Sequence, residues 1–172
     1  MNAKARQFDS FDAAFAMAFE EEVSGETFFA ALGETEPDPL RAALWVKVAL
    51  IENRTVAALR PLAEALGVTP TDEAEVRRIG RDQAREWQAL PFAEVMAIMV
   101  REYPSGYLAE FKAMLPVAPP NAKRAVQLLI DHEAAIIDMA RAELAGTPDP
   151  AAPLDAYLSG LMDWTLGEQR VS

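Results

Sequence analysis

The residues that could do chemistry in this chain are a few glutamates and one histidine. The 172 residues include no cysteine, which excludes disulfides, thiolate metal sites and cysteine nucleophiles. His132 is the only histidine, so a site with two or three imidazoles cannot be built within one chain. The glutamates of interest, Glu22, Glu52 and Glu133, lie in largely apolar helical patterns. Carboxylates with few imidazoles favour hard ions such as manganese, magnesium or ferrous iron over zinc or copper.

Helical spacing indicates which of these side chains point inward. Glu22 shares a helix face with three phenylalanines, although it also belongs to an E-E-E run that could lie on the surface. Glu52 and Glu133 lie on mostly apolar helices, so we expect both in the interior. His132 precedes Glu133 by one residue, which is about 100° around a helix, so the two need not face the same centre. A hydrogen-bonded helix residue or a surface group is the alternative for His132.

The elements that must position these residues are all helical, and we expect one all-α domain over residues 1–172. The expected order is hairpin one at 9–66, a crossover at 68–90, hairpin two at 91–146 and a C-terminal helix at 150–166. Gly33 closes the first helix, which covers residues 9–33. Pro61 lies inside the second helix, so we expect a kink or break there, and Pro104 should interrupt the third.

The two hairpins resemble each other at one fixed offset. A shift of 81 residues matches Phe11 with Phe92, Glu21 with Glu102, Ser24-Gly25 with Ser105-Gly106, and Glu52 with Glu133. The charged segment at 68–90 is left over. We therefore expect it to be the long crossover that joins two hairpins stacked in parallel.

At this point the residues resemble a known family. The first helix reads A-F-E-E-E-V-S-G-E-T-F-F-A-A-L, and it is similar to the first helix of rubrerythrin-like members of the ferritin-like superfamily. In that helix an inward glutamate is followed by a small residue and an aromatic pair, which here are Glu22, Gly25 and Phe28-Phe29. The segments A-L-I-E-N-R-T-V and D-H-E-A-A-I-I resemble the second and fourth helices. The resemblance implies a ferritin-like four-helix bundle.

The resemblance also implies a dimetal-carboxylate site, in degenerate form. Its ligands would be Glu22, Glu52 and Glu133, with Glu102 and His132 as further candidates. Thr55 and Ile136 stand where the family has the histidines of its Glu-x-x-His pairs, and Tyr103, beside Glu102, takes the ligand position of the third helix. We therefore expect no standard di-iron centre, and iron or manganese is the implied cofactor if a metal binds.

The composition of the chain disfavours some classes of binding partner. The formal net charge is −11, which disfavours nucleic acid and anionic membrane surfaces. No segment is apolar enough to span a bilayer, and the first residues lack the apolar core of a signal peptide. The absence of cysteine fits a reducing compartment, so we expect a cytoplasmic protein.

Three functions remain open. One is a ferritin-like scaffold that has lost its metals and acts as a binding or structural protein, with a pocket for a small apolar ligand. Another is a metal-binding ferritin-like protein with an oxidoreductase or metal-handling role. The third is a homodimer, in which the tail helix packs on its own bundle or on a neighbour through Leu154, Leu158, Leu161 and Trp164. A heme-oxygenase-like bundle is an alternative fold, with His132 as its one candidate ligand.

Overall fold

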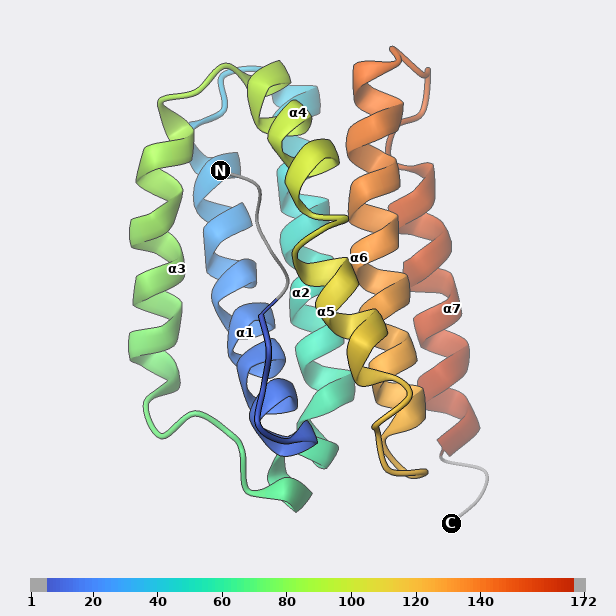
Figure 1. Ribbon diagram of the computed structural model, residues 1–172. Helices are drawn as coiled ribbons and strands as arrows, with labels where there is room; N and C mark the ends of the chain where they lie inside the picture. The colour runs from blue at the N-terminus through green and yellow to red at the C-terminus, as the bar shows by residue number, and fades with distance from the viewer. Residues whose placement is uncertain (1–5, 169–172) are drawn as a thin grey trace.

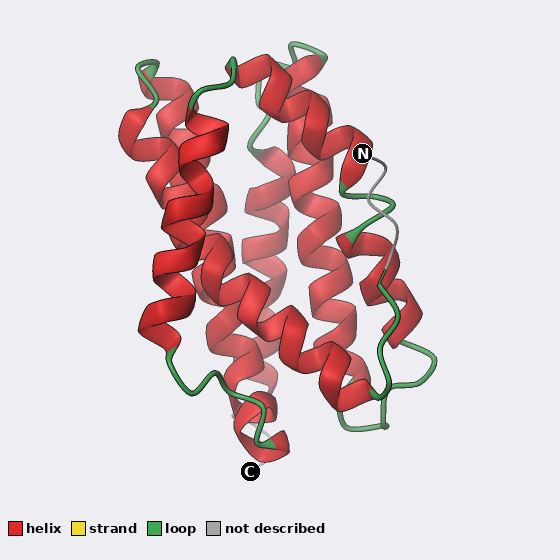
Figure 2. Cartoon of the chain, turned by 60° about the vertical axis from the view of Figure 1, so that its left-hand side comes forward, coloured by secondary structure: helices red, strands yellow, loops and turns green. Residues whose placement is uncertain are grey.

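The computed structural model describes the backbone of residues 6–168 and the side chains of residues 6–161, and all of its regular structure is helical. The described residues contain no strand, which confirms the all-α prediction (Figure 2). The helices in chain order are α1 (Phe11–Thr35), α2 (Pro39–Leu66), α3 (Glu73–Gln88), α4 (Phe92–Glu102), α5 (Tyr107–Met114), α6 (Lys123–Leu144) and α7 (Ala152–Glu168). No described helix is long and apolar enough to cross a membrane.

Helices α1 and α2 lie side by side and run in opposite directions (Figure 1). Ser10 caps α1 by accepting a hydrogen bond from the backbone N–H of Ala13, and Asp38 caps α2 in the same way. Gly67 ends α2 in the left-handed conformation, which favours glycine. The expected hairpin is therefore present, although α1 continues past Gly33 to Thr35.

Of the kink or break expected at Pro61, the structure excludes the break, because α2 continues through this residue to Leu66. A proline inside a helix removes one hydrogen bond, here to the carbonyl of Ala57. Both Ala57 and Pro61 lie on the exposed face of α2. The carbonyl that loses its partner is therefore on the side of water, which lowers the cost of the proline.

Helix α3 returns along α1 and is the crossover between the hairpins. It runs from the end of the molecule where α2 finishes to the end where α4 begins (Figure 1). Gly80 permits a close approach, since a Cβ atom at this position would lie 2.1 Å from the carbonyl oxygen of Ser24 on α1. The backbones of α1 and α3 are therefore in contact at Gly80, which only glycine allows.

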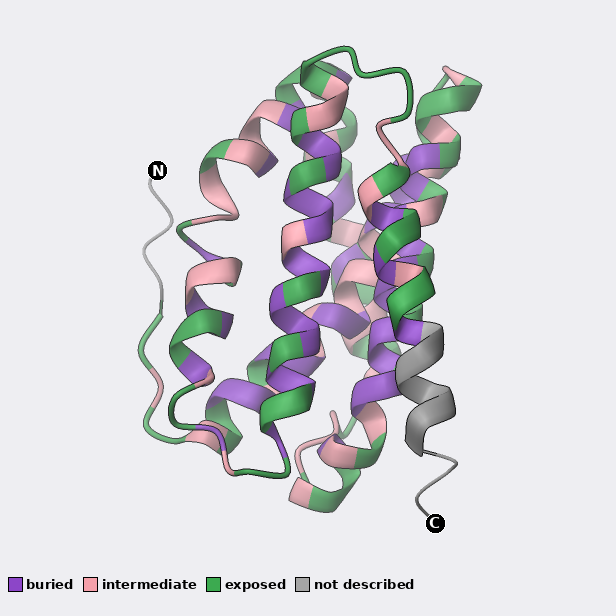
Figure 3. Ribbon diagram, turned by 90° about the vertical axis from the view of Figure 1, so that its right-hand side faces the viewer, coloured by how far each residue is buried: buried purple, intermediate pink, exposed green. Residues whose placement is uncertain are grey.

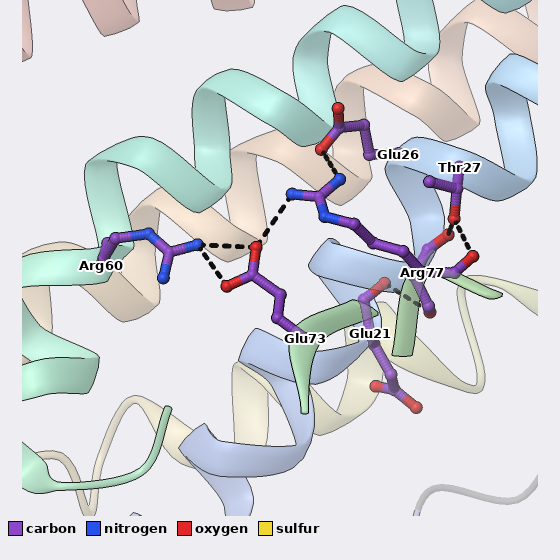
Figure 4. A network of polar contacts seen from close by, with 7 residues as sticks. Glu21, Glu26, Thr27, Arg60, Glu73 and Arg77 are labelled. Atoms are coloured by element: carbon purple, nitrogen blue, oxygen red, sulfur yellow. Dashed lines mark hydrogen bonds and ion pairs between the residues drawn. The ribbon is translucent and has the colours of Figure 1, made fainter. Parts of the chain in front are cut away.

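Ion pairs also join α3 to the first hairpin, as Figure 4 shows. Arg77 lies between Glu26 of α1, at 2.5 Å, and Glu73 of its own helix, at 3.0 Å. Arg60 of α2 bonds the same Glu73 at 3.0 Å. The hydroxyl of Thr27 donates a hydrogen bond of 2.7 Å to the backbone carbonyl of Arg77. Charged residues of α3 thus form ion pairs with oppositely charged residues of α1 and α2.

The second hairpin consists of α4 and α5 on one side and α6 on the other. The turn at residues 103–106 separates α4 from α5, so the predicted interruption at Pro104 is confirmed. Both short helices pack against α6, which also contacts α2 and α7. Figure 3 shows buried residues on the inward faces of the helices and exposed residues on their outer faces. Helix α6 is buried over an unusually broad face because it has neighbours on several sides.

The tail helix α7 packs on its own chain, against α2 and α6. Leu154, Tyr157 and Leu161 of this helix are buried, with Leu158 partly buried beside them. The side chain of Trp164 lies outside the described residues. Of the two packing arrangements that the sequence left open for this helix, the described side chains adopt the one within the chain.

Candidate functional site

Three helices bring a set of ionisable side chains to the middle of the core. Glu22 comes from α1, Glu52 from α2, and His132 and Glu133 from α6. All four are buried, with exposed fractions of 3%, 4%, 1% and 4% in that order. Each lies near the middle of its helix, so its position is set by long-range packing rather than by a loop.

His132 lies between the two glutamates of the first hairpin. Its Nδ1 is 3.3 Å from Oε2 of Glu22, and its Nε2 is 3.5 Å from Oε2 of Glu52. One donor atom from each of the three residues can be chosen so that all lie within 4.8 Å of one another. However, Oε2 of Glu22 and both ring nitrogens have no hydrogen-bond partner among the described residues. The three groups converge, and the facing atoms of Glu22 and His132 lack a hydrogen bond. We call them the central triad.

Burial and mutual charge shift the acid–base behaviour of this region. Burial raises the pKa of Glu52 to about 8, against the opposing charge of His132. Burial alone would lower the pKa of His132, but the charges of Glu22 and Glu52 outweigh it and raise this pKa well above the usual value. Burial also raises the pKa of Glu133 well above its usual value. The core thus holds carboxyl groups that ionise only when a positive charge is near.

Gly25 makes room for Glu52 against α1. A Cβ atom on Gly25 would lie 2.8 Å from Cδ of Glu52 and 2.9 Å from its Oε2. The small residue one turn after Glu22 thus lets a carboxylate of α2 lie directly on the backbone of α1. Any larger residue would displace the carboxyl group.

Thr55 and Ile136, which stand where the resembled family has histidines, both lie in the core. Thr55 is fully buried, and its hydroxyl shares a hydrogen bond of 2.7 Å with the hydroxyl of Tyr157 on α7. Ile136 is buried and apolar. Neither donates a ligand atom, but His132 places an imidazole between Glu22 and Glu52. Helix α6 has neighbouring helices on several sides, so consecutive residues on it can both be buried. His132 and Glu133 are such a pair, and both line the same pocket.

Glu102 lies apart from the central triad. It is the last residue of α4, its side chain is 29% exposed, and it pairs with Arg101 at 2.9 Å. The neighbouring Tyr103 lies closer to the core, and burial together with the charge of Glu133 raises its pKa well above the usual value. The structure therefore brings Glu22, Glu52 and His132 together, places Glu133 on the same pocket, and leaves Glu102 at the rim.

A pocket of about 590 Å³ opens on these residues. Its floor is formed by the central triad and Glu133, which are buried, and its rim by Arg6, Gln83, Glu86 and Tyr107, which are exposed. Glu102, which is half-buried, also lies at the rim. The remaining lining residues are buried or half-buried, and several of them are aromatic. They are Glu21, Ser24, Gly25, Phe28, Phe29, Trp87, Tyr103, Gly106, Glu110, Phe111 and Ile136. This volume is in the range of small-molecule sites.

Arg6 is a feature of the pocket that sequence reasoning missed. Its side chain donates to both carboxyl oxygens of Glu110, from Nε to Oε1 at 3.0 Å and from Nη2 to Oε2 at 2.6 Å, and also contacts Glu21 at 2.7 Å. The Arg6 hydrogen bonds help to hold the pKa of Glu110 below its usual value despite its burial. Burial raises the pKa of Glu21 to about 7. No local pattern could have paired Arg6 with a helix 104 residues further along the chain.

Comparison of the chain with protein-family models, with curated proteins and with solved structures found no match. The function must therefore be argued from the geometry of the site.

Proposed function

We propose that this protein is a ferritin-like helical bundle that binds one divalent transition-metal ion through Glu22, Glu52 and His132. The observation that carries the proposal is the convergence of three buried donor groups, within 4.8 Å, whose facing atoms are mostly without hydrogen bonds. Buried polar atoms are nearly always paired in folded proteins. A cation among these three side chains would give each of them a partner.

The spacing of the donor atoms supports a single ion. Atoms that bind one metal at about 2.1 Å lie about 3.0–3.5 Å apart in tetrahedral or octahedral geometry. The two His132 contacts measure 3.3 and 3.5 Å, and one of them would be a spacing between two ligands of the ion. They involve different ring nitrogens, and an ion takes only one of these. The other nitrogen can then donate its proton to the second glutamate, an arrangement that commonly orients metal-binding histidines.

Charge balance supports the same proposal. Two carboxylates neutralise a divalent ion, and no arginine or lysine lies among the groups that shift the pKa values of Glu52 and His132. Two carboxylates and one imidazole suit ferrous iron or manganese. Glu22, Glu52 and His132 would hold the ion next to the pocket that they line, and the ion would supply Lewis acidity or redox chemistry there. We include in this proposal that the protein has an oxidoreductase or metal-handling role.

The helix order supports the ferritin-like part of the proposal. An antiparallel pair, a crossover along the length of the bundle and a second antiparallel pair are the connections of ferritin-like folds (Figure 1). Thr55 and Ile136 stand where a second imidazole would be needed for a dimetal site, so we propose one ion rather than two.

The test is a titration of the chelator-treated protein with manganous ion, and with ferrous ion under anaerobic conditions, followed by calorimetry. We expect one ion per chain, with Kd in the micromolar range or below. Glu52→Gln should weaken binding by about 100-fold, because it removes a charged ligand. Gly25→Ala should weaken it by about 10-fold or more, because its Cβ displaces the Glu52 carboxylate.

Glu26→Gln is the matched control. Glu26 lies one turn from Glu22 on α1 but pairs with Arg77 at 2.5 Å, so its loss should leave the metal affinity unchanged. A wild-type protein that binds neither ion contradicts the proposal. It would favour the second candidate, a metal-free scaffold in which protonated His132 bridges the two glutamates. Equal binding by wild type and Glu52→Gln contradicts the assignment of the ligands.

A further inference from the structure

We propose that the pocket above the central triad binds an organic cation, a protonated amine carried on an aromatic or apolar body. The inference goes beyond the metal proposal and does not depend on it. It rests on the acidic groups of the pocket wall, on a buried carboxyl oxygen that has no hydrogen-bond partner, and on the aromatic side chains around it.

The wall of the pocket has a large excess of acid. Seven glutamates line it, against one arginine and one histidine. The arginine, Arg6, is already bonded to Glu110 and Glu21. A divalent ion in the central triad would still leave more acidic groups than basic ones. Acidic groups in a low-dielectric cleft favour a cationic ligand over an anionic one, so anionic molecules are poor ligands here.

Glu133 gives this charge a specific position deep in the pocket. Its side chain is 4% exposed, lines the cavity, and lies outside the central triad. Its Oε1 has no hydrogen-bond partner among the described residues. A buried, unpaired carboxyl oxygen is costly, and an ammonium group with three donors is a ligand that can satisfy it. This oxygen distinguishes the pocket from an ordinary cluster of surface acids.

Aromatic rings surround the acidic floor and rim. Phe28 and Trp87 meet edge to face with centroids 5.3 Å apart, and Tyr103 and Tyr107 do the same at 5.3 Å. All four rings line the pocket. Ring faces attract ammonium groups and also pack against apolar bodies. The two pairs come from different helices, α1 and α3 in one case and the α4–α5 turn region in the other. A ligand with one cationic end and one apolar end fits these walls.

The test compares three molecules of nearly equal size by calorimetry on the metal-free protein in the presence of a chelator. They are 2-phenylethylamine, which is protonated at neutral pH, 2-phenylethanol and 3-phenylpropanoate. We expect the amine to bind at least 10-fold more tightly than the alcohol, and the carboxylate not to bind. Because no metal is present, this result does not depend on the fate of the metal proposal.

Variants locate the site. Glu133→Gln keeps the shape of the side chain and should weaken amine binding by 10-fold or more, with little effect on the alcohol. Trp87→Leu should weaken it about 3-fold or more. Glu94→Gln is the control, since Glu94 is an exposed acid of α4 outside the pocket and its loss changes the net charge by the same amount.

Glu102→Gln at the half-exposed rim keeps the test valid if Glu133→Gln does not fold. It should weaken amine binding 2-fold to 5-fold. Three results would overturn the proposal: no binding of the amine, equal binding of amine and alcohol, or amine binding that neither glutamine variant weakens more than Glu94→Gln does.

Discussion

Helix α1 carries acidic residues on two sides, and their surroundings differ. Toward α3, Glu26 pairs with Arg77 at 2.5 Å and Glu34 pairs with Arg81 at 2.8 Å. Toward α2 and α6, Glu22 is buried beside Glu52, and the nearest cationic group is the imidazole of His132. Glu26 and Glu34, which face α3, each have an arginine of the same chain as a partner. Those facing the core lack an arginine and have atoms without hydrogen bonds.

This difference indicates which acids hold the fold and which are available to a ligand. Exposed ion pairs contribute little to stability, typically below about 1 kcal/mol each. Buried carboxylates are costly unless a cation is near. The α1–α3 contact should therefore depend on packing more than on its ion pairs, and the central triad should depend on protons or on a metal.

The largest expected effect is on the α1–α3 contact. Gly80→Ala should lower the free energy of unfolding by about 2–3 kcal/mol, because the new Cβ would lie 2.1 Å from the Ser24 carbonyl oxygen and the helices must move apart. Chemical denaturation measures this change. Arg77→Met, which removes the ion pairs but keeps an apolar stem, should cost about 1 kcal/mol or less.

Gly160→Ala of α7 is the control for the helix propensity of alanine. No atom lies within 4 Å of a Cβ at this position, so the substitution should be neutral or stabilising by up to about 1 kcal/mol. If Arg77→Met costs more than Gly80→Ala, the contact is held by charge, and the contrast drawn between the two sides of α1 is wrong.

A second effect is expected from pH on the metal-free protein. An unfolded Glu52 loses its proton near pH 4.5, whereas in the fold it keeps the proton to about pH 8. Between these values the folded state binds more protons, so stability falls as pH rises. His132 acts in the same direction, since its raised pKa stabilises the fold below the unfolded value of 6.5, and this is lost at higher pH. Denaturation should show a progressive loss of stability between pH 5 and 8.

Two variants from the metal titration, Glu52→Gln and Glu26→Gln, also test this pH dependence. Glu52→Gln should flatten this pH slope, whereas Glu26→Gln should keep it. Saturating manganous ion should reverse the slope, because protons compete with the metal for the same groups. A metal-free protein whose stability rises from pH 5 to 8 would contradict the description of the central triad.

Much of the fold could be predicted because its signals are local. Caps and breakers such as Ser10, Gly67 and Pro104 determine where helices start and stop, and the periodicity of the helices indicated that Glu52 and Glu133 face inward. Pro61 does not break α2, because the effect of a proline depends on which side of the helix faces water. The sequence shows the proline, but it does not show that this side of the helix is exposed to water.

The site was less predictable because it depends on which helices meet. The 100° between His132 and Glu133 left open whether they face one centre, and both line the same pocket because contacts with α2, α4, α5 and α7 bury a broad face of α6. The 81-residue repeat matched Glu102 with Glu21, yet Glu102 ends a helix at the pocket rim. The bonds from Arg6 to Glu110 and from Thr55 to Tyr157 join segments more than 100 residues apart.

The measurement that tests the central claim most directly is an anomalous difference map from crystals of the protein grown with manganous chloride. We expect one strong peak in the core, about 2.0–2.3 Å from carboxyl oxygens of Glu22 and Glu52 and from one ring nitrogen of His132. The absence of a peak at this position in crystals containing the ion, or a peak only at surface acids, would contradict the account.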